Sequence, residues 1–237
     1  MAIKLSLVIP TYNEAANIAV LCQKLINVLN TFPFNCEIIV VDDDSPDSTY
    51  KIVEELALQD ARIKVFRRTA VRGLAQAVVY GWNNCRGEII GVMDGDLQHP
   101  AELLKTMLNQ MLSGQEIDIV IASRYVAGGG ILVNSLWQKI RSALAIFLGS
   151  IFLPEIFKSV KDPMSGYFIL RKEVIAGRKL DPLGYKILLE VLVIGKYRKI
   201  AEVPYLFGRR LAGVTKAGLK ECLFYLAHLL RLKKSKK

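Results

Sequence analysis

The strongest constraint on the fold is an alternation, through the first 125 residues, of short apolar runs with stretches of helical periodicity. The runs are rich in Ile and Val, carry no polar alternation, and occupy residues 5–10, 36–43, 63–68, 88–94 and 117–124. The helical stretches lie between them, near 15–31, 47–59, 73–85 and 100–113. Continuous apolar strands are buried on both faces, as in a parallel sheet covered by helices. We therefore expect an α/β fold with a mainly parallel sheet flanked by helices.

Polar residues directly follow four of the apolar runs, at positions 11–14, 42–44, 94–96 and 123–125. In open α/β sheets, ligands bind in a crevice beyond the carboxyl ends of the strands. The sequence therefore predicts one ligand-binding crevice where these four segments meet.

Three consecutive carboxylates, Asp42, Asp43 and Asp44, end the second run with no cation nearby in the sequence. The next residues, 45–48, fit a helix N-terminus, where Ser or Asp caps free N–H groups and Pro suits the first turn. Helix capping leaves the three carboxylates unexplained. We expect them at a nucleotide site, because an aspartate at such a strand end accepts hydrogen bonds from a ribose or a base.

The pair Asp94 and Asp96 is the sharpest candidate for chemistry. Gly95 between them allows a tight turn, so both carboxylates can face one divalent cation. Oxygen ligands of this kind suit Mg²⁺ or Mn²⁺, and Gln98 adds a neutral amide oxygen two residues later. The sequence predicts a metal site at Asp94, Asp96 and Gln98; the alternative is a pair of solvated loop aspartates.

The chain carries 32 basic and 22 acidic residues, a formal net charge of +10. Such an excess suits a phosphorylated substrate or an anionic membrane, and nucleic acid is disfavoured because basic and aromatic residues are not interleaved. Arginine binds phosphate oxygens with its fork of donors. Arg124 directly follows an apolar run, so we expect it at the same sheet edge as the aspartate pair. The full set of candidate cations is Arg72, Arg124, Arg141, Arg209, Arg210 and Lys216.

Several enzyme classes are excluded by missing motifs. The only histidines are His99 and His228, and neither accompanies a nucleophile-elbow sequence, which argues against a serine or cysteine hydrolase. A glycine-rich dinucleotide fingerprint and a Walker sequence are also absent, so a dehydrogenase or a P-loop enzyme is not expected.

The end of the chain has the pattern of an amphipathic helix. Within residues 218–232 the polar side chains fall in an arc of about 100°, and nearly all the others are apolar. Five of the last seven residues are basic. This pattern fits a helix lying in a membrane interface over anionic headgroups; the alternative is a helix packed on the core with a solvated basic tail. The polar residues of the arc are Lys220, Glu221, His228 and Arg231.

These patterns divide the chain into a catalytic domain, 1–216, and an interfacial helix with a basic tail, 217–237. No apolar run approaches the roughly 18–20 residues that span a bilayer. The four cysteines are scattered and read as reduced thiols, and the chain starts on a strand-like pattern. We expect a cytoplasmic protein that is peripheral at the cytoplasmic face of a membrane.

Eight segments, in this order, resemble family 2 glycosyltransferases with the GT-A fold, and among them the dolichol- or polyprenol-phosphate sugar synthases. They extend essentially from residue 5 to residue 220 and read VIPTYNEAANI, IIVVDDDSPDST, RGLAQAVVYGW, GVMDGDLQHPAEL, IASRYVAGGG, DPMSGYFILRKEV, GYKILLEVL and VPYLFGRRLAGVTK. The resemblance implies a GT-A nucleotide-diphospho-sugar transferase fold with a C-terminal amphipathic helix.

The resemblance also implies roles for individual residues. The nucleotide sugar would be bound by Pro10, Tyr12, Glu14, Asp42, Asp43, Arg72, Asp94, Gly95, Arg210 and Lys216. The metal on the donor diphosphate would be held by Asp94, Asp96 and Gln98. The lipid phosphate would meet Arg124 and Arg141. The catalytic set would be Asp96, Arg124, Arg141 and Arg210.

The implied activity is inverting transfer of a hexose, first of all mannose from GDP-mannose, to dolichyl or polyprenyl phosphate. UDP-glucose or a UDP-N-acetylhexosamine is the alternative donor, and a membrane-anchoring subunit is a possible partner. An alternative of another class is a non-catalytic subunit that binds lipid phosphate. A soluble glycosyltransferase acting on polysaccharide or protein is a third; it needs a carboxylate base, for which Asp162 is the candidate.

Overall fold

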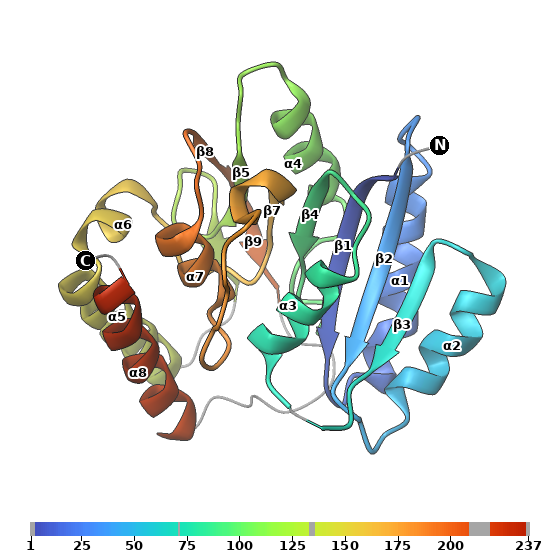
Figure 1. The fold of residues 1–237 in the computed structure, drawn as a ribbon, viewed down its shortest axis with the longest axis horizontal. Helices are drawn as coiled ribbons and strands as arrows, with labels where there is room; N and C mark the ends of the chain where they lie inside the picture. Colours follow the sequence, from blue (N-terminus) through green and yellow to red (C-terminus); the bar gives the residue numbers. More distant parts are fainter. Residues whose placement is uncertain (1–2, 71, 133–135, 209–218, 236–237) are drawn as a thin grey trace.

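The computed structural model describes residues 3–70, 72–132, 136–208 and 219–235. A seven-stranded sheet forms its centre, with the strand order β3-β2-β1-β4-β7-β5-β8 (Figure 1). All pairings are parallel except those of β7, which runs antiparallel to both neighbours. The strands are β1 (Ile3–Thr11), β2 (Asn35–Asp42), β3 (Ile63–Arg67), β4 (Ile89–Val92), β5 (Ile119–Ser123), β7 (Phe168–Arg171) and β8 (Ile200–Pro204).

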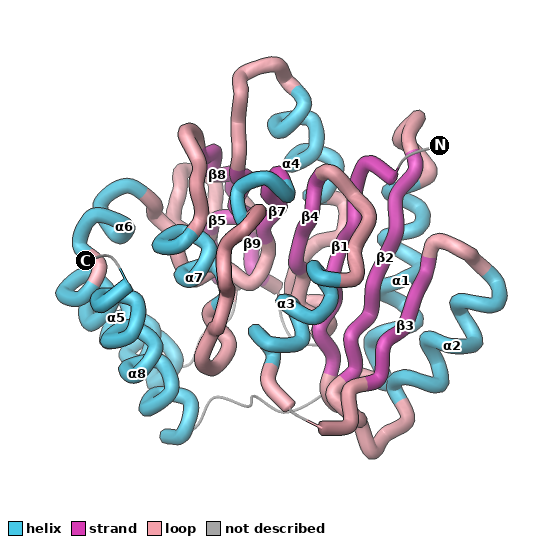
Figure 2. The backbone as a smooth tube through the Cα atoms, viewed as in Figure 1, coloured by secondary structure: helices cyan, strands magenta, loops and turns pink. Residues whose placement is uncertain are grey.

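The alternation of strands and helices expected from the sequence is confirmed (Figure 2). The five apolar runs are β1 to β5, and the helical stretches between them are α1 (Ala15–Leu29), α2 (Thr49–Gln59), α3 (Leu74–Asn83) and α4 (Leu103–Leu112). A second, two-stranded sheet pairs β6 (Gly130–Ile131) with β9 (Leu206–Phe207). The remaining helices are α5 (Leu136–Phe152), α6 (Pro154–Ser159), α7 (Ile187–Ile194), α8 (Leu219–Ser235) and a 3₁₀ turn at Lys172–Ile175.

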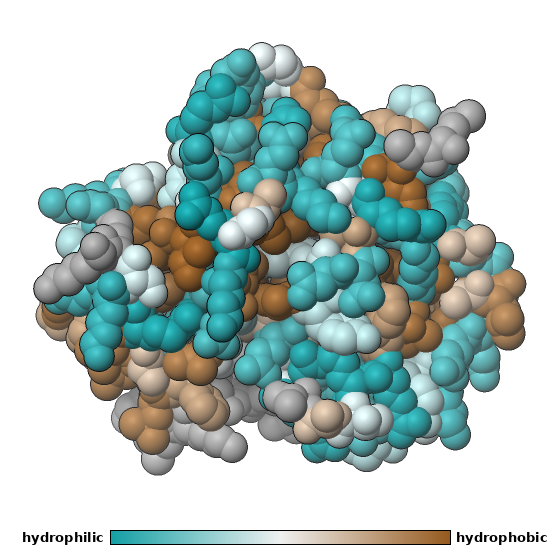
Figure 3. All heavy atoms as spheres, viewed as in Figure 1, coloured by the Kyte–Doolittle hydropathy of each residue, from teal (hydrophilic) through white to brown (hydrophobic). Residues whose placement is uncertain are grey.

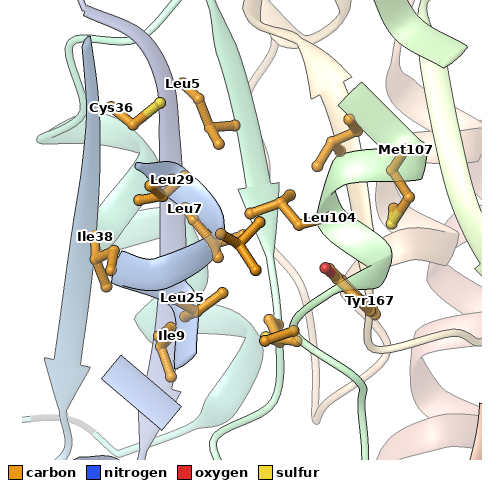
Figure 4. Close-up of a cluster of buried hydrophobic side chains, with 14 of the residues drawn as sticks. Leu5, Leu7, Ile9, Leu25, Leu29, Cys36, Ile38, Leu104, Met107 and Tyr167 are labelled. Carbon is orange, nitrogen blue, oxygen red and sulfur yellow. The ribbon is translucent and has the colours of Figure 1, made fainter. Parts of the chain in front are cut away.

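The sheet has a hydrophobic core on each face, as continuous apolar strands require. One core joins β1 to α1 and α4, and Figure 4 shows Leu7 of β1 close to Leu25 and Leu104 within it. The other core joins the opposite face of the sheet to α3, α7 and α8. Burial on both faces fixes the strands, so their carboxyl ends form a rigid edge.

The helices α5 and α8 pack against each other at the side of the molecule away from β1 to β3, and we call them the outer helices (Figure 1). The Tyr225 hydroxyl of α8 donates a hydrogen bond to the carbonyl oxygen of Ala145 in α5, at 2.8 Å. Apolar residues reach the surface on this side (Figure 3). The exposed apolar side chains are Ile140, Leu144, Phe147 and Ile151 of α5 and Leu223, Phe224, Leu226 and Leu230 of α8.

The polar arc of α8 faces the protein where its side chains are described. His228 is fully buried, and its Nε2 lies 2.8 Å from Oε2 of Glu190 in α7. Arg231 also donates a hydrogen bond to Glu190. Burial raises the pKa of Glu190, but the hydrogen bond from His228 and the charge of Arg231 outweigh it and lower that pKa below its ordinary value. One side of α8 is therefore fixed to the core by a buried ion cluster, and leucines lie on the other.

Within the described residues, none of the helices combines the length and the apolar character needed to cross a bilayer.

Candidate active site

Three turns beyond the carboxyl ends of β1, β2 and β4 contain a non-glycine residue in the left-handed backbone region. They are Asn13 with φ 57°, Asp44 with φ 57° and Leu97 with φ 60°. Residues other than glycine rarely adopt this backbone conformation, and those that do are often found at functional sites. These turns mark the edge of the sheet at which the sequence predicts a crevice.

The turn after β4, residues 94–99, holds the predicted metal ligands, and we call it the aspartate turn. Asp96 is buried, and its Oδ1 accepts a hydrogen bond from the backbone N–H of Gln98 at 3.2 Å. The side-chain amide of Gln98 donates to the carbonyl oxygen of Gly208 at 3.0 Å, which leaves its Oε1 as a potential ligand atom. A Cβ at Gly95 would lie 3.3 Å from Thr11, so the turn packs closely on the end of β1.

The insertion of β7 between β4 and β5 completes this edge. Because β7 is antiparallel to both, the loop that enters it, residues 162–167, lies beside the ends of β4 and β5. Ser165 Oγ ties this loop to β5 through a 2.7 Å hydrogen bond to the carbonyl oxygen of Ala122. A Cβ at Gly166 would overlap the Asp94 carboxylate, so a larger residue there would displace that side chain.

A cavity of about 180 Å³ is lined by residues of the aspartate turn and the 162–167 loop. Four residues predicted from the sequence line it together: Asp94, Asp96, Gln98 and Arg124. Two carboxylates and a guanidinium thus share one small space. The cavity also has lining residues that were not predicted: Leu74, His99, Met164, Gly166, Tyr185, Lys186 and Phe207.

The guanidinium of Arg124 is held by Asp162, whose side chain is fully buried. Nε of Arg124 donates to Oδ2 and its terminal NH2 to Oδ1, both at 2.7 Å, and its backbone N–H donates to Oδ2 at 3.1 Å. Burial alone would lower the pKa of Arg124, but the hydrogen bonds and charge of Asp162 outweigh it and raise that pKa. The cation at this wall is therefore permanent and fixed in orientation.

Lys186 supplies a second cation at the same cavity. Its Nζ donates a 3.0 Å hydrogen bond to the carbonyl oxygen of Met164, and it lies 4.7 Å from the centre of the Tyr185 ring. Burial, with repulsion from Arg124, lowers the pKa of Lys186 from 10.5 to about 8. An anion bound beside Lys186 would stabilise its charged form, which burial disfavours.

The carboxylates after β2 have protein partners. Asp42 is fully buried and accepts hydrogen bonds from Thr11 Oγ1 at 2.9 Å and from Ser45 Oγ at 2.6 Å. Asp43 pairs with Arg68 at 2.7 Å and accepts the backbone N–H of Gly73 at 2.6 Å. Asp43 thus pairs with a cation that is distant in the sequence, and the expected role of Asp42 and Asp43 in nucleotide binding stays a prediction.

Asp44, Tyr12 and Arg72 form a neighbouring group. Arg67 pairs with Asp44 at 2.6 Å. The Arg72 guanidinium donates to the Tyr12 hydroxyl at 3.2 Å and lies 5.0 Å from the centre of that ring. The ends of β1 and β2 are thus joined by an exposed aromatic and cationic group, and its role in nucleotide binding stays a prediction.

Other predicted residues lie apart from the cavity lining. Pro10 is inside β1, opposite Val41 of β2. Glu14 is buried at the start of α1, where its carboxylate accepts a hydrogen bond from Asn17 at 2.8 Å. Arg141 belongs to α5 and is not among the residues that line the cavity. Arg209, Arg210 and Lys216 lie outside the described residues.

The donor set at the aspartate turn fits a divalent cation. It offers two carboxylates and an amide oxygen, and the side chain of Asp94 is 31% exposed at the cavity. In the part of the chain that the structure describes, no cluster of three or more His, Cys, Asp or Glu residues could hold a metal. Mg²⁺ and Mn²⁺ commonly take one or two carboxylates and complete their shell with water and phosphate oxygens. The residues fit such an ion shared with a ligand.

Lys186 and His99 are the main residues that the sequence analysis missed. Lys186 precedes the apolar run ILLEVL, and no motif in the sequence marks it as a buried cation. His99 was weighed only as a member of a hydrolase triad, whereas its Nε2 lies 3.3 Å from Oδ2 of Asp94. The available signal was that His99 follows Asp96 by only three residues, in the same turn as the predicted metal ligands.

The sequence is similar to those of known glycosyltransferases. The model of the glycosyl transferase family 2 matches residues 6–177. Relatives include the dolichol-phosphate mannosyltransferases of Pyrococcus furiosus (45% identical, covering 98% of this chain and 64% of that protein), Mycosarcoma maydis (34%, 96% and 78%) and Saccharomyces cerevisiae (32%, 98% and 88%). The chain therefore spans less than two thirds of the Pyrococcus relative.

Solved structures share the fold at low sequence identity. Mannosyl-3-phosphoglycerate synthase from Rubrobacter xylanophilus has a TM-score of 0.70 at 19% identity, over 99% of this chain and 76% of that one. Glucosyl-3-phosphoglycerate synthase from Mycobacterium tuberculosis, solved with Mn²⁺, UDP-glucose and phosphoglyceric acid, has a TM-score of 0.68 at 19% identity, over 98% and 79%. The expected GT-A-type fold is confirmed by this likeness. Together with the family match and the three relatives, it confirms the resemblance seen in the sequence: the chain belongs to glycosyl transferase family 2.

Proposed function

We propose that the chain transfers a mannosyl group from GDP-mannose to dolichyl or polyprenyl phosphate at a membrane surface. The observation that carries the proposal is the cavity in which Asp94 and Asp96 lie with Arg124 and Lys186. The two carboxylates suit a metal-bound diphosphate, and the two cations suit a second phosphate. The names of the three relatives support the choice of sugar and acceptor.

The donor would occupy the aspartate turn. Asp94, Asp96 and the amide oxygen of Gln98 are the residues that would hold a divalent ion, which offsets the negative charge of a departing diphosphate when bound. The nucleoside would extend toward the ends of β1 and β2, where Tyr12, Asp42 and Arg72 lie. Arg210 and Lys216 belong to the same proposed donor site on the strength of the family resemblance.

The acceptor phosphate would meet Arg124 and Lys186, and by the resemblance also Arg141. One phosphate oxygen forms the bond to the anomeric carbon from the face opposite the diphosphate, and the bond from that carbon to the diphosphate oxygen breaks. The leaving diphosphate keeps the electron pair, and the configuration inverts. Because the phosphate oxygen is already anionic at neutral pH, no proton has to be removed, and the protein contributes position and charge.

The state of Asp162 favours a phosphate acceptor over a sugar or protein hydroxyl. A hydroxyl acceptor needs a general base within hydrogen-bond reach. Asp162, the carboxylate considered for this role, is fully buried, and both of its oxygens accept hydrogen bonds from Arg124. Asp94 and Asp96, the two carboxylates that line the cavity, are assigned to the metal. This arrangement argues against the soluble glycosyltransferase alternative.

The outer helices would hold the protein at the membrane. Their exposed apolar side chains provide a surface for the lipid acceptor, and Lys233 and Lys234 are exposed at the end of α8. Apolar and basic groups together favour an interface with anionic lipid. A peripheral position at the cytoplasmic face, with or without an anchoring subunit, belongs to this proposal.

A donor and acceptor panel tests the function. Purified protein with Mg²⁺ or Mn²⁺ is incubated with GDP-mannose, UDP-glucose or UDP-N-acetylglucosamine, and with either a short-chain polyprenyl phosphate or 3-phosphoglycerate. We expect a lipid-linked sugar from GDP-mannose alone. Product only from a UDP-sugar would replace the donor, and product only from 3-phosphoglycerate would replace the acceptor class. Binding of polyprenyl phosphate without turnover of any donor would favour the non-catalytic subunit.

A further inference from the structure

The carboxylate of Asp94 is confined from two sides. Oδ2 lies 3.3 Å from Nε2 of His99, and the carboxylate also packs so closely on Gly166 that a Cβ there would overlap it. The His99 side chain is only 2% exposed, so the contact is made from within the core. The orientation of this carboxylate is therefore set by buried groups, although Asp94 itself reaches the cavity.

The ring of His99 is fixed by three aromatic neighbours. The centres of the Tyr167, Tyr205 and Phe207 rings lie 5.4, 5.4 and 5.3 Å from its own centre. These rings come from the entrance of β7 and from the β8–β9 segment, which are distant in sequence from His99. Packing against these three rings holds the imidazole in place beside Asp94.

The two ring nitrogens of His99 have different surroundings. Nδ1 is buried and has no hydrogen-bond partner among the described residues, whereas Nε2 faces the carboxylate. A carboxylate only accepts hydrogen bonds, so the hydrogen of a neutral ring belongs on Nε2. A ring needed only for packing would not require a polar nitrogen aimed at Asp94.

We propose that His99 is a positioning residue, whose Nε2–H holds the carboxylate of Asp94 in its metal-binding orientation. The inference rests on the proposed function, because it assigns the aspartate turn to a divalent cation. Groups that hydrogen-bond to metal ligands fix ligand orientation, and their loss commonly costs about 10- to 100-fold in metal affinity or activity. His99 acts on the ion through Asp94 and need not contact it.

Matched substitutions at position 99 isolate the Nε2 donor. His99→Phe keeps a ring in the aromatic surroundings and removes the donor. His99→Gln places an amide N–H close to the Nε2 position, whereas His99→Asn places one close to Nδ1. Tyr205→Phe changes the same surroundings without touching Asp94 and serves as the packing control. Thermal unfolding without metal reports the cost of each change to the fold.

The readout is binding of Mn²⁺, followed by the loss of the EPR signal of the free ion, with and without GDP. We expect His99→Phe and His99→Asn to weaken Mn²⁺ binding by about 10- to 100-fold, with His99→Gln and Tyr205→Phe close to wild type. The Gln and Asn pair keeps the test decisive if the Phe variant does not fold. Equal binding by wild type, His99→Phe and His99→Asn would overturn the inference alone. A wild-type protein that binds no Mn²⁺ with GDP would overturn the proposed metal site, and the inference with it.

Discussion

At the carboxyl ends of the central strands, charged side chains are buried, whereas on the outer helices apolar side chains are exposed. Asp96 and Asp162 are buried within the protein, and Arg124 is largely so. Leu144 and Phe147 of α5 are 55% and 60% exposed. Both regions reverse the ordinary distribution of residues in a soluble protein.

The two reversals have different physical costs. Burying a charge costs free energy unless a partner compensates it, so the sheet edge is filled with specific pairs such as Asp162 with Arg124. Exposing an apolar side chain forfeits only the free energy that its burial would contribute. The outer helices therefore need no specific partner residues and can contact any apolar environment. The sheet edge therefore suits a ligand of defined geometry, and the outer helices suit a surface.

The largest expected effect concerns the buried pair at the sheet edge. Asp162→Ala leaves Arg124 buried without its partner, and we expect a loss of roughly 3–5 kcal/mol of folding stability together with activity. Adding Arg124→Met removes the stranded charge, so the double variant recovers much of the stability while staying inactive. Urea unfolding and the transfer assay measure the two quantities. A double variant as unstable as the single one would contradict the charge argument.

The second prediction concerns the aspartate turn and distinguishes the role of the sheet edge from that of the outer helices. Asp96→Asn should lower transfer by about 100- to 1,000-fold, as removal of one stabilising charge contact does in other enzymes. Binding to anionic vesicles should be unchanged, because the outer helices are untouched. Glu88→Gln, which removes a solvent-exposed partner of Lys4, is the matched control. Full activity of Asp96→Asn would remove the basis for a metal at this turn.

The third prediction concerns the outer helices. Leu144→Ser with Phe147→Ser should weaken vesicle binding by about 10- to 100-fold per side chain, since burying each side chain in a membrane contributes about 1.5–3 kcal/mol. Thermal stability and the binding of GDP should not fall. Leu58→Ser on α2, where the leucine is 89% exposed, should leave vesicle binding unchanged. Equal losses at both places would mean that the outer helices have no special role in membrane binding.

The smallest expected effect is a pH dependence from Lys186. Its pKa of about 8 in the protein is below its ordinary value of 10.5. Between these two pH values the unfolded chain binds more protons, so the contribution of Lys186 to stability rises with pH. Binding of the acceptor phosphate needs the charged form of Lys186, so affinity for a short-chain polyprenyl phosphate should fall roughly threefold from pH 7.5 to 8.5. Lys186→Arg should flatten this profile, because arginine stays charged. A profile unchanged by the substitution would assign the pH dependence to another group.

Local periodicity sufficed to predict most of the fold. Strands β1 to β5 and helices α1 to α4 were predictable because burial on both faces requires uninterrupted apolar runs. The position of β7 in the sheet was not predictable. Its four residues pair with β4 and β5, and nothing in the local sequence specifies these neighbours. Of the 162–167 loop only Asp162 was considered for the site, and the position of Gly166 beside Asp94 could not be predicted.

The candidate site was predictable where the chemistry is local. The spacing of Asp94 and Asp96, and Arg124 at a strand end, needed only neighbouring residues. The pairing of Asp43 with Arg68 was not predictable, since the two residues are 25 positions apart. The same limit applies to α8: helical periodicity gives the angle between His228 and Arg231, but not the buried Glu190, 38 residues before His228, that they face.

The ion cluster around Glu190 has a consequence for how the protein meets a lipid surface. His228 and Arg231 fix α8 to α7 through groups that no membrane contact disturbs. The helix is therefore formed before the protein binds the membrane. No conformational entropy is lost by a coil-to-helix transition when it contacts the lipid. The far-ultraviolet circular dichroism spectrum should stay constant as vesicles are added, and the enthalpy of adsorption should lack a folding contribution. Membrane association then resembles the contact of two preformed surfaces.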